Sequence, residues 1–314
     1  MRIVYFGGDV FAVPTLMKLV DSGHQVLGVV TPAGKGVSNS APHVNPIQVE
    51  AEKFDLPVYD YDVTELSEVL KKIHDLKADL GITASFGEEF LEPFKSAFSA
   101  GFIGTHPSLL PKYRGPSAIS WAILNNERKT GVTVFRITDQ PYAGQVIVQR
   151  ETMIRPNENW TDLHFRLARI ACDAIDAALN ILDQDLHHPG EAQDESQATL
   201  APELKESDGY LRFDEPAEVI ALRCRAMWPR PGTSCRYISE NGEVEHIQIV
   251  RATAEPGVFE FPPGTITSEF KVTTAEGLLQ IQEMKPAKGK VRSWQQFIKE
   301  RRVSPGERFE PIPR

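Results

Sequence analysis

Hydrophobic positions in the first half of the chain alternate between two patterns. Short apolar runs predict buried strands, and the segments between them carry apolar residues at helical spacing. The expected strands cover residues 2–6, 25–31, 79–85, 102–105, 132–137 and 146–150. The expected helices cover residues 11–20, 47–54, 66–76 and 160–182. Apolar strands joined by such helices indicate an α/β fold with a doubly wound, mostly parallel sheet whose faces are covered.

The pattern changes after residue 183. Residues 184–204 are polar and contain Pro189 and Gly190, as is typical of a linker. One helix is then expected at 217–227, followed by short β-like runs at 234–238, 245–251, 264–267, 270–274 and 278–284. Closely spaced short strands predict a small, closed or partly closed β-barrel. We therefore expect one domain at 1–183, a linker at 184–204 and a second domain at 205–314.

Composition narrows the class of protein. The chain has 314 residues, of which 41% are hydrophobic and 25% charged, which is ordinary globular usage. No apolar run approaches the roughly 18–20 residues that span a bilayer, and the start MRIVYFGGDVFAVP lacks a secretory layout. Three scattered cysteines suit neither a disulfide framework nor a metal site. We expect a cytoplasmic protein with no membrane partner.

Charge is distributed unevenly. The net charge is -9, but residues 1–204 hold 17 basic and 27 acidic side chains, whereas residues 205–314 hold 17 and 16. The last thirty residues carry nine basic and three acidic side chains. Such an end is either a solvated tail or a surface for phosphate groups. The acidic total therefore does not exclude a nucleic-acid partner.

Common nucleotide and metal motifs are missing from the sequence. Gly7 and Gly8 follow the first strand, where doubly wound folds bind anions, but the segment GGDVFA is not GxGxxG. These glycines are equally explained by a tight turn. No P-loop, GxSxG or HExxH pattern occurs, and His187 and His188 lack spaced ligand partners. We expect neither a dinucleotide nor a metal.

His106 is the best-placed candidate for chemistry. It follows the predicted strand 102–105 and opens the segment HPSLLPKYRG. Ligands of open α/β sheets bind outside the carboxyl ends of the strands. A histidine there can handle protons or polarise a carbonyl group, although it can also serve only to hydrogen-bond the turn.

From this segment onward the sequence resembles a known family. HPSLLPKYRG, residues 119–124 and TGVTV at 130–134 resemble the core of the 10-formyltetrahydrofolate-dependent formyltransferases. FGGDVFAVPTL at 6–16 and SFGEEFLEP at 85–93 are similar to the family's first turn and folate-pocket loop. The segments 193–204, 225–232 and 285–307 resemble its methionyl-tRNA formyltransferase branch. This resemblance implies a Rossmann-like domain followed by an OB-like barrel.

The resemblance also implies the chemistry and its participants. The branch transfers a formyl group from 10-formyltetrahydrofolate, a co-substrate, to the amine of methionyl initiator tRNA, with no metal. We expect a monomer. The implied folate-binding positions are Phe86, Gly87, Ser108, Leu109, Leu110 and Pro111. The implied tRNA-binding positions are Lys35, Arg114, Lys288, Lys290 and Arg292.

Two of the family's three catalytic side chains are replaced. The family carries Asn-x-His at the end of a strand and an Asp in a downstream loop. His106 matches the histidine, but Gly104 stands at the Asn position and Tyr142 at the Asp position. The Asn would stabilise the formyl oxyanion, and the Asp would orient the histidine. Asp139 and Glu88 are nearby carboxylates that could substitute.

These replacements leave two hypotheses. One is a formyltransferase of the methionyl-tRNA type with weak or altered catalysis around His106. The other is a non-catalytic paralogue that binds folate, tRNA or both. Formyl transfer to another small amine, such as a nucleotide-linked sugar, is less favoured because the tRNA-type C-terminal domain is present.

Overall fold

The computed structural model describes residues 1–32, 45–61, 66–87, 91–258 and 260–313. Within these ranges the chain forms two compact units. The first comprises residues 1–118, 129–153 and 164–202, and the second comprises residues 119–128, 154–163 and 203–314.

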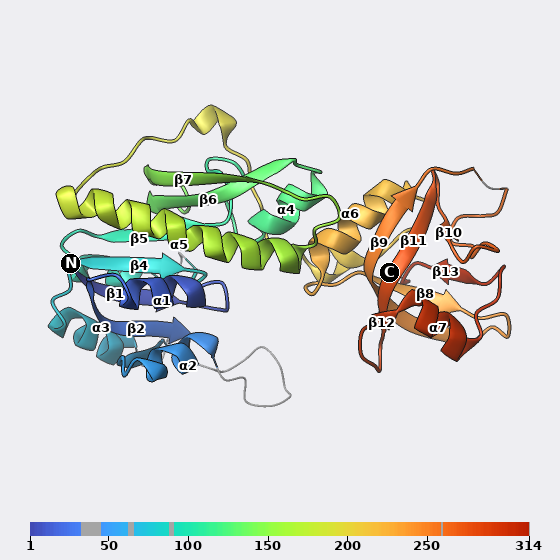
Figure 1. Ribbon diagram of the computed structural model, residues 1–314, viewed down its shortest axis with the longest axis horizontal. Helices are drawn as coiled ribbons and strands as arrows, with labels where there is room; N and C mark the ends of the chain where they lie inside the picture. Colours follow the sequence, from blue (N-terminus) through green and yellow to red (C-terminus); the bar gives the residue numbers. More distant parts are fainter. Residues whose placement is uncertain (33–44, 62–65, 88–90, 259, 314) are drawn as a thin grey trace. The chain divides into compact units, whose positions relative to one another are not determined.

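The described part of the first unit is built on a seven-stranded sheet with the order β3-β2-β1-β4-β5-β6-β7 (Figure 1). Its strands are β1 (Arg2–Gly7), β2 (Gln25–Pro32), β3 (Val58–Tyr61), β4 (Leu80–Ala84), β5 (Phe102–His106), β6 (Lys129–Arg136) and β7 (Val146–Met153). Strands β1 to β5 are parallel, whereas β6 and β7 are antiparallel. The predicted mostly parallel α/β sheet is confirmed. The pattern missed β3 because it is a four-residue edge strand with no fully buried position.

The helices of the described chain up to residue 202 are α1 (Val13–Val20), α2 (Pro46–Lys53), α3 (Leu66–Asp75), α4 (Ala118–Leu124) and α5 (Trp160–Gln184), with the 3₁₀ helices η3 (Glu92–Ala97) and η4 (Glu195–Gln197). Successive residues of β1 point to opposite faces of the sheet. Phe6 belongs to one buried cluster with Ile73 of α3 and Phe94 of η3. Tyr5 faces the other side, where its hydroxyl donates to the carbonyl of Ala12 at 2.7 Å.

The carboxyl ends of β1, β4 and β5 meet at one edge of the sheet. Gly7 pairs with Ala84, and Ala84 pairs with Thr105. The chain must then turn closely at Gly8, since a Cβ there would lie 1.6 Å from the carbonyl oxygen of Ser85. A glycine is required at this position for close backbone approach, whether or not an anion binds there.

The polar segment predicted as a linker packs along the first unit. The amide of Arg114 donates to the carbonyl of Thr199 at 2.8 Å, and the amide of Ala201 donates to the carbonyl of Arg114 at 2.7 Å. Arg114 thus pairs with Leu200 as in a short parallel ladder. These bonds fix the last residues of this segment beside the turn that follows β5.

The second unit contains a small antiparallel sheet with the order β10-β11-β9-β8-β13, and β12 pairs with β11. Its elements are α6 (Ala217–Met227), β8 (Ser234–Ile238), β9 (Val244–Glu255), β10 (Val272–Thr273), β11 (Leu278–Pro286), β12 (Arg292–Ser293), α7 (Trp294–Arg301) and β13 (Arg308–Glu310), after the 3₁₀ turn η5 (Glu206–Gly209). The amide of Gly264 donates to Thr273, and the carbonyl of Gly264 accepts from the amide of Phe309, both at 2.8 Å. This bridging segment nearly closes the sheet, so the predicted barrel is confirmed.

The pattern missed α7, which carries part of the barrel's core. Ser293 caps its first turn, and its hydroxyl accepts from the amide of Gln296 at 3.2 Å. Trp294 and Phe297 are buried and stack with their ring centroids 5.7 Å apart. These two aromatic residues of the basic end therefore belong to the core and are not exposed platforms for bases.

Candidate functional site

A cavity of about 420 Å³ opens at the carboxyl edge of the first unit's sheet. This volume lies in the usual range for small-molecule sites. The carboxyl ends of β4, β5 and β6, the turns after β1, β4 and β5 and the β6–β7 loop supply its lining residues. They are Asp9, Thr83, Ser85, Phe86, Gly87, Gly104, Thr105, His106, Pro107, Gly115, Pro116, Phe135, Ile137 and Tyr142.

His106 lines this cavity at the end of β5. Its side chain is buried, and Nε2 lies 2.8 Å from the carbonyl oxygen of Tyr113. Burial lowers the pKa of the imidazole to about 4, although the Tyr113 bond favours the charged form. The ring is therefore neutral at pH 7. Because a carbonyl can only accept, Nε2 carries the proton and Nδ1 is the nitrogen that can take one up.

Tyr142 lies beside His106 in the same cavity. It sits in the loop between β6 and β7 and has a left-handed backbone, with φ of 60°. The two ring centroids are 4.8 Å apart and the planes are tilted by 52°. The phenol thus stands against the imidazole. The cavity remains open beside both rings.

Ile137 occupies the space next to Gly104. A Cβ built on Gly104 would lie 2.8 Å from Cδ1 of Ile137 and 3.1 Å from Cγ2 of Thr83. An Asn side chain could enter only if the Ile137 side chain moved. Sequence reasoning missed this residue, because nothing in the local pattern shows that positions 104 and 137 meet.

Asp9 is a cavity-lining carboxylate that sequence reasoning did not single out. Its Oδ1 accepts from the amide of Phe11 at 2.9 Å, which fixes the side chain in the turn after β1. The available signal was its place directly after the first strand. Asp139 does not line the cavity: its carboxylate is 94% exposed and pairs with Lys95 at 2.9 Å. The Asp139 carboxylate therefore faces solvent outside the cavity, and Glu88 lies outside the described residues.

The predicted folate-binding residues divide into two groups. Phe86 and Gly87 line the cavity. The other four, Ser108 to Pro111, form the turn beyond Pro107 and are not among the lining residues. Within this turn the hydroxyl of Ser108 donates to the carbonyl of Lys112 at 2.6 Å, and the amide of Leu110 donates to Thr133 at 3.1 Å. In the described structure these residues shape the wall that follows His106.

The predicted tRNA-binding residues that the structure describes are divided between the two units. Lys35 lies outside the described residues. Lys288 and Lys290 are exposed between β11 and β12, and Arg292 pairs with Glu300. Arg114 is engaged inside the first unit, with its side chain 11% exposed. A tRNA-binding role for these residues stays a prediction, and Arg114 has the weakest geometric support for it.

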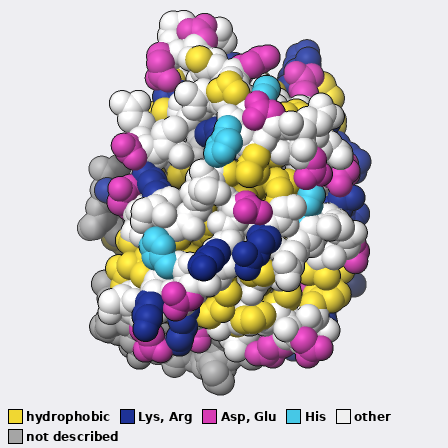
Figure 2. Space-filling view, turned by 90° about the vertical axis from the view of Figure 1, so that its left-hand side faces the viewer, with side chains coloured by type: hydrophobic (Ala, Val, Ile, Leu, Met, Phe, Trp, Pro, Cys, Tyr) yellow, Lys and Arg dark blue, Asp and Glu magenta, His cyan; other side chains and the backbone are white. Residues whose placement is uncertain are grey.

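Charged groups elsewhere suggest no metal centre or membrane segment. One end of the molecule shows acidic and basic side chains intermixed, with histidines lying apart from one another (Figure 2). Within the described ranges, no three His, Cys, Asp or Glu side chains are grouped to hold a metal ion. The helices in the same ranges include none long and apolar enough to cross a bilayer.

Comparison with solved structures shows the fold. An N-formyltransferase from Helicobacter canadensis, solved with folinic acid and dTDP-3-aminofucose, is 18% identical with a TM-score of 0.65, covering 91% of this chain and 99% of that one. HypX from Aquifex aeolicus, solved with tetrahydrofolic acid, is 18% identical with a TM-score of 0.64, covering 96% of this chain. This chain spans 47% of the HypX chain.

Sequence comparison shows the family. The profile described as "Formyl transferase" matches residues 1–179, and the profile "Formyl transferase, C-terminal domain" matches residues 203–302. A methionyl-tRNA formyltransferase from Heliobacterium modesticaldum is 31% identical over 98% of this chain and 100% of its own length. One from Solibacter usitatus is 35% identical over 90% of each chain. The chain belongs to the formyl transferase family.

Proposed function

We propose that the protein transfers a formyl group from 10-formyltetrahydrofolate to the amino group of methionyl initiator tRNA. The full-length similarity to methionyl-tRNA formyltransferases supports this acceptor. The observation that carries the proposal is the position of His106, a buried neutral imidazole lining the cavity at the end of β5. The relatives' role in translation favours a cytoplasmic setting.

The chemistry requires one proton to move from the acceptor to the folate. The amine nitrogen attacks the formyl carbon, so a new C–N bond forms and the bond from that carbon to N10 breaks. The amine nitrogen gives up a proton and N10 gains one. In our proposal the unprotonated Nδ1 of His106 accepts the proton and returns it to N10. The Tyr142 hydroxyl is the candidate donor to the oxygen that becomes negative.

Asp9 gives the cavity a preference for a cation. Among the described lining residues it is the one carboxylate, and His106, which lines the same cavity, is neutral. An amine enters the site largely as an ammonium ion when its pKa is at or above the ambient pH. A carboxylate attracts this ammonium and helps remove its first proton. We therefore assign Asp9 to the acceptor side of the reaction.

The replaced residues predict slow turnover. Loss of one oxyanion donor typically costs about 10²–10³ in rate. Loss of the carboxylate that orients a histidine costs about 10⁴ in the Ser-His-Asp system. Ile137 beside Gly104, and Tyr142 against His106, fill space that the missing side chains would need. This filling favours the second candidate, a family member that binds folate or tRNA without efficient transfer.

A single-turnover assay with charged initiator tRNA and 10-formyltetrahydrofolate separates the two candidates. We expect measurable formylation by the wild-type chain and loss of about 10²-fold or more in His106→Ala, since the proton acceptor is removed. The variant Gly104→Asn/Ile137→Val/Tyr142→Asp should be faster than wild type. No formylation by the wild type, together with folate binding and gain of activity in this variant, would establish the binding protein instead.

A further inference from the structure

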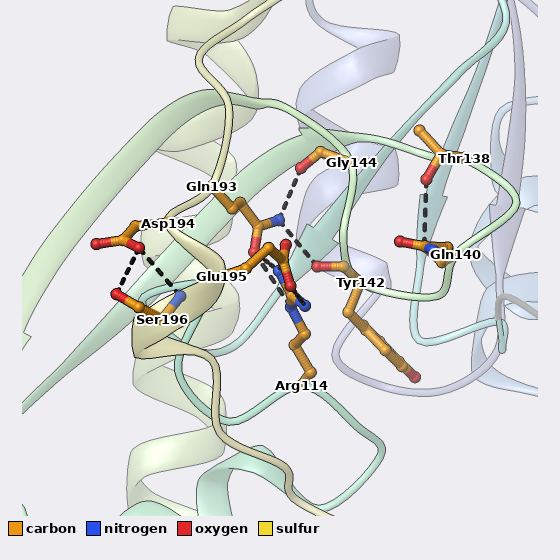
Figure 3. Close-up of polar contacts among 9 residues, drawn as sticks. All are labelled: Arg114, Thr138, Gln140, Tyr142, Gly144, Gln193, Asp194, Glu195 and Ser196. Carbon is orange, nitrogen blue, oxygen red and sulfur yellow. Dashed lines mark hydrogen bonds and ion pairs between the residues drawn. The ribbon is translucent and has the colours of Figure 1, made fainter.

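The loop that carries Tyr142 needs support from outside itself. Left-handed backbone costs a non-glycine residue roughly 1–2 kcal/mol, and Tyr142 adopts it. Two backbone carbonyls of this loop, those of Tyr142 and Gly144, are bonded by a single side chain. The Nε2 amide of Gln193 donates to Tyr142 at 2.9 Å and to Gly144 at 2.7 Å. Figure 3 shows this amide reaching the loop from the segment that follows α5.

Arg114 fixes the orientation of the Gln193 amide. Nε and Nη2 of Arg114 donate to Oε1 of Gln193 at 3.2 and 2.7 Å. Since a guanidinium can only donate and a carbonyl can only accept, the amide oxygen must face Arg114 and the amide nitrogen must face the loop. Glu195 holds the guanidinium from its other side, with Nη1 and Nη2 at 2.8 and 2.7 Å from its two oxygens (Figure 3).

The same stretch of backbone also holds His106. The imidazole donates to the carbonyl of Tyr113, the residue immediately before Arg114. The amide of Tyr113 is in turn bonded to the Thr199 hydroxyl at 2.9 Å, and Thr199 also accepts from the amide of Arg114. One wall of the cavity therefore positions the imidazole directly and positions the Tyr142 loop through Gln193.

We propose that Arg114 and Gln193 are positioning residues for formyl transfer, so that segment 193–201 is part of the active site. They form a polar clamp, defined as the Arg114–Gln193 pair and its bonds to Glu195, Tyr142 and Gly144. The clamp sets the distance between the imidazole and the phenol without touching substrate. This inference rests on the proposed function for its kinetic consequence, but its structural part can be tested without any turnover.

Hydrogen exchange of the full-length protein tests the structural part. In Gln193→Ala we expect the amides of the 138–144 loop to exchange about tenfold faster, because two bonds to the loop are removed. Gln193→Glu keeps an acceptor for Arg114 but cannot donate, so it should loosen the loop equally. Ser196→Ala is the matched control: within the described ranges its hydroxyl donates to the neighbouring Asp194, at 2.7 Å, and to no residue of the clamp. Unchanged exchange of the loop in Gln193→Ala would overturn the clamp.

Kinetics of formylation test the functional part. Misplacement of reacting groups lowers the rate more than the affinity, so Gln193→Ala should lose about 10- to 100-fold in kcat. Its KM for 10-formyltetrahydrofolate should stay within about threefold, since the lining residues are intact. The kcat of Arg114→Lys should lie between those of wild type and Gln193→Ala, because a lysine cannot pair with Gln193 and Glu195 in the two-pronged way of a guanidinium. Equal losses in Gln193→Ala and Ser196→Ala would show a merely structural effect.

The two proposals fail in different ways. If the wild-type chain forms no formyl-methionyl-tRNA while loop exchange still depends on Gln193, the clamp stands and formyl transfer is wrong. Suppose that the wild type is active and that Gln193→Ala keeps full kcat although the amides of its 138–144 loop exchange faster. The positioning role is then wrong and formyl transfer stands. Thermal unfolding of each variant confirms that the chain is folded before either comparison.

Discussion

The imidazole of His106 and the phenol of Tyr142 contact each other across the cavity, with ring centroids 4.8 Å apart. By the resemblance in the sequence, Tyr142 is expected to stand where the family has an Asp, and a carboxylate there would favour the charged imidazole. The phenol provides no such charge at neutral pH. Burial alone lowers the pKa of His106 to about 4, against the hydrogen bond to Tyr113, which favours the charged form. The Tyr142 side chain therefore adds no charge that would oppose the effect of burial, and the imidazole of His106 is neutral at pH 7.

Restoring the carboxylate should raise the pKa of His106. In Tyr142→Asp a negative charge beside the ring stabilises the imidazolium, and we expect an increase of about one unit or more. Tyr142→Phe adds no charge and is the matched control. Titration of the imidazole by NMR measures both. The same pKa in Tyr142→Asp and Tyr142→Phe would contradict this electrostatic account.

The lowered pKa also makes stability depend on pH. The folded-state pKa of about 4 lies below the ordinary value of 6.5, so the unfolded chain binds more protons between these values. Stability is therefore fully present above about pH 6.5 and declines as the pH falls toward 4. From pH 7 to pH 5 the free energy of unfolding should drop by about 2 kcal/mol from this group. Urea unfolding should show this drop in wild type and a correspondingly smaller one in His106→Asn.

Gly104 and Ile137 should behave as a coupled pair. Gly104→Asn overpacks the space beside Ile137 and should destabilise the fold by about 1–3 kcal/mol. Ile137→Val removes the Cδ1 atom that lies closest to the new side chain, so the double variant should regain part of this loss. A double-mutant cycle of unfolding free energies gives the coupling. Strict additivity would show that Ile137 does not block the Asn position.

Substitutions of Asp9 and Asp139 should have different effects on the rate of formylation. Asp9→Asn removes the carboxylate that lines the cavity, and we expect the rate of formylation to fall about 10- to 100-fold. Asp139→Asn removes an exposed ion pair with Lys95 and should leave the rate near that of wild type. Single-turnover rates at one pH make the comparison. The reverse order of effects would overturn the role assigned to Asp9.

Lys288 and Lys290 should contribute to tRNA affinity by neutralising backbone phosphates. Both are exposed, and removing either ammonium group should reduce the slope of log affinity against log salt by about 0.7–0.9. Replacing both with Ala should weaken binding uniformly across tRNA sequences. Arg301→Ala serves for comparison, because that guanidinium already pairs with Glu245 at 2.8 Å. A salt slope unchanged in the double variant would remove these lysines from the interface.

The local sequence was sufficient to predict the helices and strands with a clear pattern of apolar residues. The buried strands β1, β4 and β5 were predicted because they are short continuous apolar runs, and the long helix α5 because its apolar residues recur at helical spacing. Strand β3 and helix α7 were not predicted, since a half-buried edge strand and a short polar helix carry little periodic signal. Their formation depends on neighbours that lie elsewhere in the sequence.

The residues of the candidate site likewise fall into those that local motifs indicated and those that only the tertiary structure brought to the cavity. Local motifs indicated His106, Gly104 and Tyr142 by resemblance, and their roles stay a prediction, whereas the placement of His106 at the end of a strand is confirmed. Only the tertiary structure decided that Asp9 lines the cavity, that Asp139 points to solvent, and that Ile137 fills the space beside Gly104.

The polar clamp shows most clearly the difference between what the sequence predicts and what the tertiary structure decides. The sequence by itself determined that residues 184–204 are polar, which is equally typical of a free linker. The tertiary structure decided that Gln193 meets Arg114 and the Tyr142 loop. The spacing of hydrophobic residues along a helix or strand predicts which of its residues are buried, because its buried face recurs at a regular interval. Hydrogen bonds between residues 51 and 79 positions apart in the sequence follow from the folded path of the chain and leave no period to detect.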